Sequence, residues 1–276
     1  MTDAFREEGS EEPQHTPLNK HKHPVILLVN SGIYYCIQCY IMLYYPQRES
    51  IPNTTGGGDN MMNMSYNTLI AGVIGAGKSH TEKLIIESLA TASDAQLVLI
   101  DPKKVELYEY RLLSNTLWYA DEEEAIYDTL CKVYDLMETR FSVMREKRQT
   151  VTDEPNVFVF IDEMAFLMQS GRKKEYVRML NQITLLGRAA RIHLILCSQV
   201  STQDVIPACI RDNMTNIVCL RQRDAGKYRY LLGDFPGRLP MIGYCYLLTP
   251  DMMRPEKVGT EDVWSIINGK EATRAA

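Results

Sequence analysis

Short apolar runs alternate with amphipathic stretches along most of the chain, from Thr68 to Leu248. The apolar runs have the length of buried strands, and the stretches between them repeat their apolar positions at helical spacing. Strands are expected at 68–71, 96–100, 157–161, 192–197, 216–220 and 243–248. Helices are expected at 78–90, 121–148, 173–188, 202–212 and 224–232. This alternation predicts an α/β fold with a mainly parallel sheet that helices cover on both faces.

The residues before this region follow a different pattern. Residues 1–20 are polar and rich in Glu, so we expect a disordered tail without a cleavable export signal. Residues 25–43 carry no charge over a length that is about enough to cross a bilayer. Asn30, Gly32 and Gln38, with strand-prone residues around them, favour a β-hairpin, and the membrane span stays the alternative.

These patterns divide the chain into four parts. We expect a tail at 1–20, an apolar segment with a Gly-rich linker at 21–66, a core domain at 67–252 and a polar tail with at most one helix at 253–276.

Composition narrows the possible partners. The 276 residues, 45% hydrophobic and 24% charged, suffice for one α/β domain with short appendages. A formal net charge of -5 excludes a basic field over the whole protein, so any contact with nucleic acid needs a local patch or a pore built by several subunits.

The cysteines indicate a reducing compartment. Seven of them are scattered through apolar runs, as buried free thiols are, and this predicts a cytoplasmic location. Four residues near the N-terminus could bind zinc, namely His21, His23, Cys36 and Cys39. A single Cys-x-x-Cys inside an apolar stretch is weak support for such a site, so we do not expect a metal there.

A phosphate-binding motif lies between the first predicted strand and helix of the core. Its glycines allow the backbone to turn tightly and aim N–H groups at phosphate, while the helix that follows directs its positive end at the anion. The lysine can reach the β and γ phosphates, and the serine hydroxyl can ligate Mg²⁺. The motif, with the residue that follows it, comprises Gly72, Val73, Ile74, Gly75, Ala76, Gly77, Lys78, Ser79 and His80.

Two further strands deliver polar residues to the same edge of the sheet. The strand at 157–161 ends in Asp162, a partner for Mg²⁺, and Glu163, which could activate the attacking water. The strand at 192–197 leads to Gln199, which could sense the γ phosphate. Together these Walker A and Walker B motifs predict a P-loop ATPase that uses ATP and Mg²⁺.

These motifs resemble the FtsK/SpoIIIE family of DNA-pumping ATPases over about 68–248. LIAGVIGAGKS and VFVFIDEMAFLM resemble the Walker motifs of that family. Three further segments resemble the family. Its Asp-Pro-Lys segment is matched by LVLIDPKKVELYEY, its helix before Walker B is matched by METRF, and its Gly-Arg-Ala-Ala-Gly-Ile-His run is matched by GRAARIH. The resemblance implies a RecA-like P-loop NTPase, here a small version of the kind carried by mobile elements.

The resemblance also implies partners and further residues. It implies a homo-oligomeric ring, expected to be a hexamer, with double-stranded DNA in its pore. Arg188 becomes the candidate arginine finger, with Arg191 in reserve. DNA contacts would go to the phosphate backbone. The candidates for these contacts are Arg211, Arg221, Arg223 and Lys227, with a second basic cluster at 172–174.

Some positions depart from the family pattern. Val200-Ser201 stand where the family has Arg-Pro, and the Pro-Thr-Arg expected after Asn213 is absent. These changes affect the expected pore contacts and leave ATP hydrolysis untouched. A related secretion-type motor that moves protein stays an alternative to a DNA translocase, because nothing in the sequence excludes a protein substrate and the net charge is acidic. A nucleotide-binding adaptor with weak hydrolysis is a further alternative, against which Glu163 and Arg188 argue.

Overall fold

The computed structural model describes residues 28–29, 32–33, 66–239 and 242–269 of a chain that divides into two compact units, 1–48 and 49–276. In the first unit, β1 (Leu28–Val29) pairs antiparallel with β2 (Gly32–Ile33). The rest of the apolar segment, the tail at 1–20, the four possible zinc ligands and the Gly-rich linker lie outside the described residues. Within the described residues, no helix is both long enough and apolar enough to cross a membrane.

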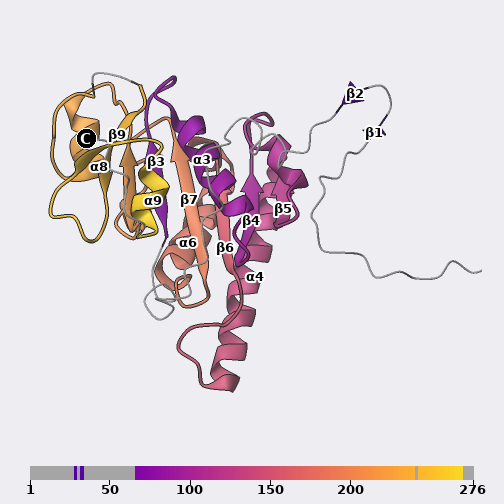
Figure 1. The fold of residues 1–276 in the computed structure, drawn as a ribbon. Helices are drawn as coiled ribbons and strands as arrows, with labels where there is room; N and C mark the ends of the chain where they lie inside the picture. The colour runs from indigo at the N-terminus through magenta and orange to yellow at the C-terminus, as the bar shows by residue number, and fades with distance from the viewer. Residues whose placement is uncertain (1–27, 30–31, 34–65, 240–241, 270–276) are drawn as a thin grey trace, which may run out of the picture. The chain divides into compact units, whose positions relative to one another are not determined.

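The second unit is built on an eight-stranded sheet in the order β10-β9-β8-β3-β7-β6-β4-β5 (Figure 1). The neighbouring strands from β8 to β5 run parallel, and β9 is antiparallel to both β8 and β10. The strands are β3 (Thr68–Ala71), β4 (Ala95–Ile100), β5 (Thr116–Ala120), β6 (Asn156–Ile161), β7 (Ile192–Ser198), β8 (Asn216–Cys219), β9 (Tyr244–Leu248) and β10 (Glu256–Gly259).

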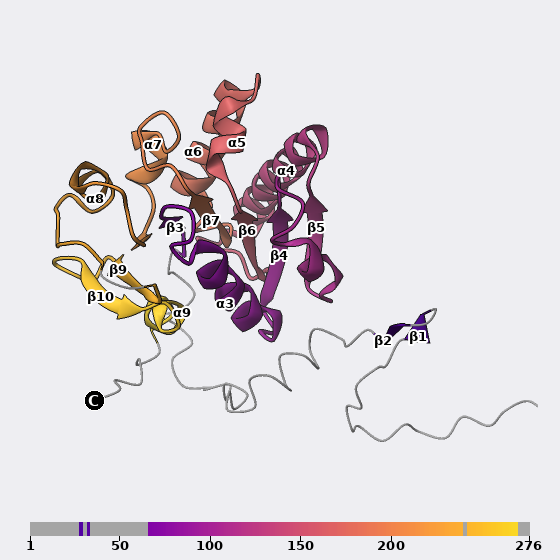
Figure 2. The ribbon, with the colours of Figure 1, turned by 90° about the horizontal axis from the view of Figure 1, so that it is seen from above.

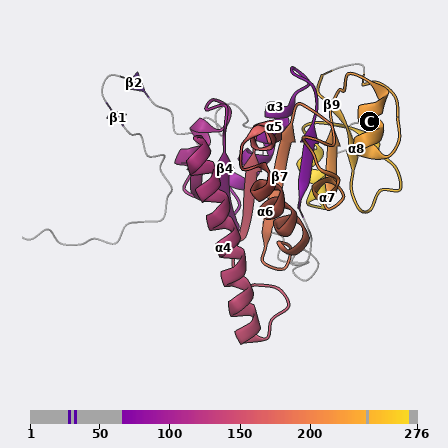
Figure 3. The same cartoon turned by 180° about the vertical axis from the view of Figure 1, so that it is seen from behind.

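Helices cover both faces of this sheet. Seen from above, α3 and α9 lie on one face, and α4, α5 and α6 lie on the other (Figure 2). Figure 3 shows the second face, where the long α4 runs beside α6. The helices are α3 (Lys78–Ala90), α4 (Glu123–Lys147), α5 (Met164–Gln169), α6 (Lys173–Leu186), α7 (Ala208–Arg211), α8 (Ala225–Leu232) and α9 (Val263–Ile267), with the 3₁₀ helix η1 (Tyr108–Leu112). The predicted mainly parallel α/β fold is confirmed.

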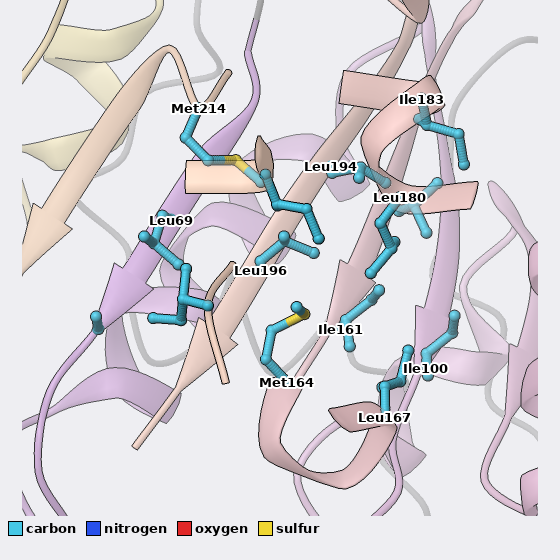
Figure 4. Packing of buried hydrophobic residues seen from close by; sticks show 14 of the residues in the cluster. Leu69, Ile100, Ile161, Met164, Leu167, Leu180, Ile183, Leu194, Leu196 and Met214 are labelled. Carbon is cyan, nitrogen blue, oxygen red and sulfur yellow. The ribbon is translucent and has the colours of Figure 1, made fainter. Parts of the chain in front are cut away.

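The alternation of side chains along each strand produces two hydrophobic cores. Successive residues of a strand point to opposite faces, so Leu69 joins the core under α4 to α8 while Ile70 joins the core under α3 and α9. Figure 4 shows the first of these cores, where Leu196 of β7 and Leu180 of α6 lie among other fully buried apolar side chains. Burial on both faces explains why the central strands are continuous apolar runs in the sequence.

The structure contains elements that the apolar pattern did not predict. The edge strand β5 is half-exposed, and β10 has a polar sequence held by backbone pairing with β9. The segment expected to be a polar tail with at most one helix therefore contains that helix, α9, and in addition the strand β10, and Trp264 of α9 packs in the second core. The helix expected at 202–212 is limited to Ala208–Arg211.

The parallel order of the central strands gathers the predicted site residues. β7 lies between β3 and β6, and β4 lies on the other side of β6. Because parallel strands end at the same edge, the loops after β3, β7, β6 and β4 meet there, where ligands bind in open α/β sheets.

Candidate functional site

The loop after β3 has the backbone shape of a phosphate cradle. Gly75 and Gly77 adopt φ values of 73° and 100°, which side-chain-bearing residues rarely adopt. Gly77 is also the N-cap of α3, so the N–H groups of the first helical turn face the space inside the loop. A Cβ on Gly72 would lie 2.7 Å from Cβ of Leu220, so only glycine fits between β3 and β8 at this point.

Two neighbouring strands anchor the loop. The N–H of Gly72 donates to the Ser198 carbonyl of β7 at 3.1 Å, and the N–H of Val73 donates to the Arg221 carbonyl beyond β8 at 3.0 Å. The buried Gln222 amide then donates to the Ala71 carbonyl at 3.0 Å. The cradle is therefore fixed by the sheet on both sides.

Lys78 and Ser79 begin α3 at the mouth of the cradle. Lys78 is buried, with 6% of its surface exposed, and burial lowers the pKa of its ammonium although Glu163 and Asp162 partly oppose that shift. Ser79 is half-buried, whereas His80 is exposed on the helix. A lysine held in this way favours a multiply charged anion, which would replace the water that burial has removed.

The two acidic residues after β6 have different surroundings. The N–H of Asp162 donates to the Ile100 carbonyl of β4 at 3.1 Å, and the residue is 1% exposed. Glu163 caps α5, and its Oε1 accepts backbone N–H groups from Ala165 and Gln199, both at 3.3 Å. The residue expected to sense the γ phosphate, Gln199, thus contacts the Walker B glutamate through its main chain.

Lys103 forms ion pairs with both acidic residues that follow β6. It follows β4 in the Asp-Pro-Lys segment, and its Nζ lies 2.8 Å from Oδ2 of Asp162 and 3.5 Å from Oε2 of Glu163. Burial by itself lowers the pKa of Lys103, but its hydrogen bond to Asp162 and the two carboxylate charges outweigh that effect and raise the pKa. In the sequence, Lys103 is visible only as part of the segment that resembles the Asp-Pro-Lys segment of the family, and nothing there assigns it a role.

Glu82 is a second residue that the sequence analysis missed. It lies one turn after Lys78 on α3, is fully buried, and is close to Asp162 and Cys197. Burial, and then the charge of Asp162, raise the pKa of Glu82 well above its ordinary value. Burial likewise raises the pKa of Cys197, so a neutral thiol lies behind the cradle. The available signal was helical spacing, which puts position 82 on the same face as the motif lysine.

Arg188 lies at the opposite edge of the sheet. It is exposed in the turn between α6 and β7, so it precedes the strand whose far end leads to Gln199. The buried Arg140 of α4 donates to the Ala190 carbonyl of the same turn at 2.7 Å. The reserve residue Arg191 has a φ of 52° and donates to the Glu154 carbonyl at 3.1 Å. Arg188 therefore lies at the end of β7 that is remote from the phosphate cradle of its own chain.

The basic residues proposed for DNA contact differ in how exposed and how engaged they are. Arg211 is engaged within the chain: its guanidinium pairs with Asp212 at 2.6 Å, donates to the Tyr230 carbonyl at 3.1 Å and stacks on the ring of Tyr230. Arg221 and Arg223 are exposed on either side of the buried Gln222.

Lys227 and the second basic cluster have intermediate environments. Lys227 is half-buried in the first turn of α8, where its N–H donates to the carboxylate of Asp224 at 3.1 Å. In the cluster at 172–174, Arg172 pairs with Glu124 at 2.7 Å and lies over the ring of Tyr127. Among these candidates the exposed side chains are therefore Arg221, Arg223 and Lys174 of the second cluster.

The residues at this edge fit a nucleoside triphosphate with Mg²⁺. The cradle presents main-chain N–H groups and Lys78 to phosphate, while Ser79 and Asp162 offer the oxygen ligands that Mg²⁺ prefers. Among the described residues, no group of three or more His, Cys, Asp and Glu side chains could hold a metal ion, and the five described cysteines are free. The strand order, the cradle and the acidic pair define a P-loop ATPase domain of the RecA-like class.

Comparison with known proteins identifies a family that this chain resembles. The FtsK/SpoIIIE family model matches residues 59–156, so this part of the chain is similar to that family. DNA translocase FtsK of Streptomyces avermitilis is 27% identical over 228 residues, which are 72% of this chain and 25% of that protein. DNA translocase FtsK of Helicobacter pylori is 32% identical over 201 residues, which are 63% of this chain and 24% of that protein. The chain thus spans about a quarter of the length of these curated relatives.

Solved structures share the fold. The pCW3 conjugation coupling protein TcpA, in its monomer form with ATPγS, has a TM-score of 0.61 at 21% identity, and the match covers 72% of this chain and 60% of TcpA. ATPases 2 and 3 of EssC from Geobacillus thermodenitrificans also have a TM-score of 0.61, at 20% identity, and the match covers 74% of this chain and 42% of that one. At these identities the likeness supports the fold alone.

Proposed function

We propose that this chain is an ATP-hydrolysing motor that moves double-stranded DNA through a homo-oligomeric ring. The observation that carries the proposal is the hydrogen bond from Val73 in the phosphate cradle to the Arg221 carbonyl, because it joins the nucleotide site directly to the exposed basic stretch. Arg221 and Arg223 are therefore held beside the cradle, where they would respond to the presence or loss of the γ phosphate.

The site residues have separate roles in this proposal. The cradle and Lys78 bind the β and γ phosphates. Ser79 and Asp162 would hold Mg²⁺, which would supply charge neutralisation at the transferring phosphoryl group. Glu163 accepts a proton from the attacking water, and its two backbone donors fix the orientation of its carboxylate. Gln199 links this carboxylate to the end of β7.

The position of Arg188 supports the proposed ring. A guanidinium that stabilises charge on the γ phosphate must approach a nucleotide, and Arg188 is at the wrong edge of its own sheet. It would therefore act on the nucleotide of a neighbouring subunit, as the family resemblance implies, with a hexamer as the expected assembly.

The protein would bind DNA through contacts to the phosphate backbone. Arg221 and Arg223 supply accessible positive charge despite the net charge of -5, and such contacts release counterions and read no sequence. The basic stretch therefore suits a motor that has to move along any duplex.

The test is ATP turnover with and without duplex DNA at increasing salt. We expect DNA to stimulate turnover, and we expect the apparent DNA affinity to fall steeply with salt. A double variant, Arg221→Gln with Arg223→Gln, should lose stimulation and keep turnover without DNA. Arg178→Gln, at a separate site on α6, serves as the control. ATP turnover that is unchanged by DNA but is stimulated by an added protein would favour the secretion-type alternative.

A further inference from the structure

Lys103 bridges the two Walker B carboxylates. Its Nζ lies 2.8 Å from Oδ2 of Asp162 and 3.5 Å from Oε2 of Glu163. Within residues 66–239 and 242–269, it is the one cation in ion-pair distance of these two acids. Both acids are nearly buried, so this pairing is screened less by solvent than a surface ion pair.

The backbone that carries Lys103 is fixed. The N–H of Asp101 donates to the Ala120 carbonyl at 2.9 Å, and the buried Asp101 carboxylate accepts the N–H of Leu107 at 2.9 Å. The N–H of Lys104 closes a turn onto the Asp101 carbonyl at 3.0 Å, with a φ of 63° at Lys104. Position 103 is therefore held beside the acids by main-chain contacts that do not depend on its own side chain.

The Lys103 side chain has room to move. It is 33% exposed, and it lines a pocket together with Glu163 and Gln199. A flexible four-carbon side chain on a fixed backbone can withdraw its ammonium group from the acids without a change in the fold.

Repulsion between their positive charges opposes the binding of Lys103 and Mg²⁺ to the same carboxylates at the same time. A Mg²⁺ ion oriented by Asp162 would bring two further positive charges to the carboxylate that Lys103 already contacts, and cations this close repel one another. We propose that Lys103 competes with Mg²⁺ for the Walker B carboxylates. It leaves them when Mg²⁺ enters with the nucleotide, and it takes them back as Mg²⁺ leaves with ADP.

The competition has a consequence for the reaction cycle. Lys103 acts through Asp162 and Glu163, so it is a positioning residue that weakens Mg²⁺ binding and favours product release. This inference rests on the nucleotide site of the proposed function and is independent of DNA.

The test is equilibrium binding of a fluorescent ADP analogue while Mg²⁺ is titrated, without DNA, in the full chain. We expect Lys103→Gln to reach half-maximal Mg²⁺-dependent binding at a Mg²⁺ concentration about three- to tenfold lower than the unmutated protein, because the competing charge is gone. The matched control is Lys104→Gln, since the adjacent Lys104 pairs with the exposed Glu122 instead. It should stay within about twofold of the unmutated protein.

An unchanged or higher Mg²⁺ requirement in Lys103→Gln overturns the proposal. If that variant does not fold, Lys103→Met, which keeps the apolar stem, replaces it under the same criterion. Lys103→Arg, which keeps the charge, should retain the unmutated Mg²⁺ requirement, and a lowered requirement there would equally contradict the competition. Failure of DNA to stimulate turnover, measured on the same preparations, would count against the motor and leave this result unaffected.

Discussion

At the scale of single residues, neighbouring side chains of the same type have different environments. Asp162 is almost fully buried and faces Lys103, whereas Glu163 caps α5 and accepts two backbone N–H groups. Such surroundings suit one carboxylate for orienting a metal and the other for accepting a proton.

This division predicts the behaviour of Glu163→Gln. The amide keeps the shape and can no longer accept the proton, so hydrolysis should fall by about 10²- to 10⁴-fold while nucleotide binding is retained. Single-turnover hydrolysis and equilibrium binding would measure the two effects separately. Loss of nucleotide binding in this variant would contradict the proposed roles.

His193 gives a residue-scale prediction about stability. Its Nδ1 accepts the N–H of Tyr66 at 3.4 Å, its Nε2 lies 3.0 Å from Oδ1 of Asn156, and burial lowers the pKa of His193 to about 3. The folded chain thus keeps His193 neutral at a pH where the unfolded chain protonates it. This contribution to stability is complete above the unfolded pKa of about 6.5 and is lost as the pH falls towards 3.

The comparison with His193→Gln isolates this effect. Between about pH 6.5 and pH 5, the unmutated protein should lose about 1.6 kcal/mol of unfolding free energy relative to the variant. Glu82, whose raised pKa acts in the opposite direction, is common to both proteins and cancels. Urea unfolding across this range gives the difference, and parallel curves would show that His193 titrates normally in the folded chain.

The motif residues could be predicted from the sequence because each depends on its own segment. The spacing of glycines, Lys78 and Ser79 fixes the cradle, and a buried strand fixes where Asp162 and Glu163 emerge. The ion pair of Lys103 depends on β4 lying beside β6, with Ile100 opposite Ile161, and no spacing within one segment contains that neighbour relation.

At the scale of elements, the turn between α6 and β7 depends on close backbone packing. A Cβ on Gly187 would lie 2.4 Å from the Ile192 carbonyl oxygen and 2.5 Å from the Ile183 carbonyl oxygen. Both are main-chain atoms, so neither can move without opening the turn that presents Arg188.

Gly187→Ala should therefore destabilise the protein by about 1–3 kcal/mol, the usual cost of overpacking. Gly171→Ala is the matched control, because a Cβ there meets no atom within 4 Å, and its effect should stay within about 0.5 kcal/mol. Chemical denaturation of both variants measures the difference. Equal stability of the two would show that the turn accommodates a side chain.

Elements at the borders of the sheet were the hardest to predict. Strands buried on both faces are apolar runs, so β4, β6 and β7 were expected from hydrophobicity alone. The sequence of β10, Glu-Lys-Val-Gly, has no such signal, and backbone bonds to β9 hold it in place. An edge strand therefore becomes visible only when its partner strand is known.

At the scale of the whole molecule, the proposed motor would work as an oligomer, because Arg188 and the phosphate cradle lie at opposite edges of one sheet. Arg188→Ala should still bind ATP and should lose DNA-stimulated turnover. Mixing it with Glu163→Gln should restore part of that turnover, because some interfaces then combine an intact Glu163 with an intact Arg188. Steady-state assays of the mixtures measure the rescue, and turnover unaffected by Arg188→Ala would remove this residue from the proposed mechanism.

The central claim is that ATP hydrolysis moves the protein along double-stranded DNA, and the most direct measurement is displacement of a third strand bound to a duplex. With ATP and Mg²⁺, the unmutated protein should release the third strand at a rate that depends on the length of duplex leading to it. Glu163→Gln should bind the same duplex and release nothing. Turnover of ATP on this duplex without displacement of the third strand would contradict the account.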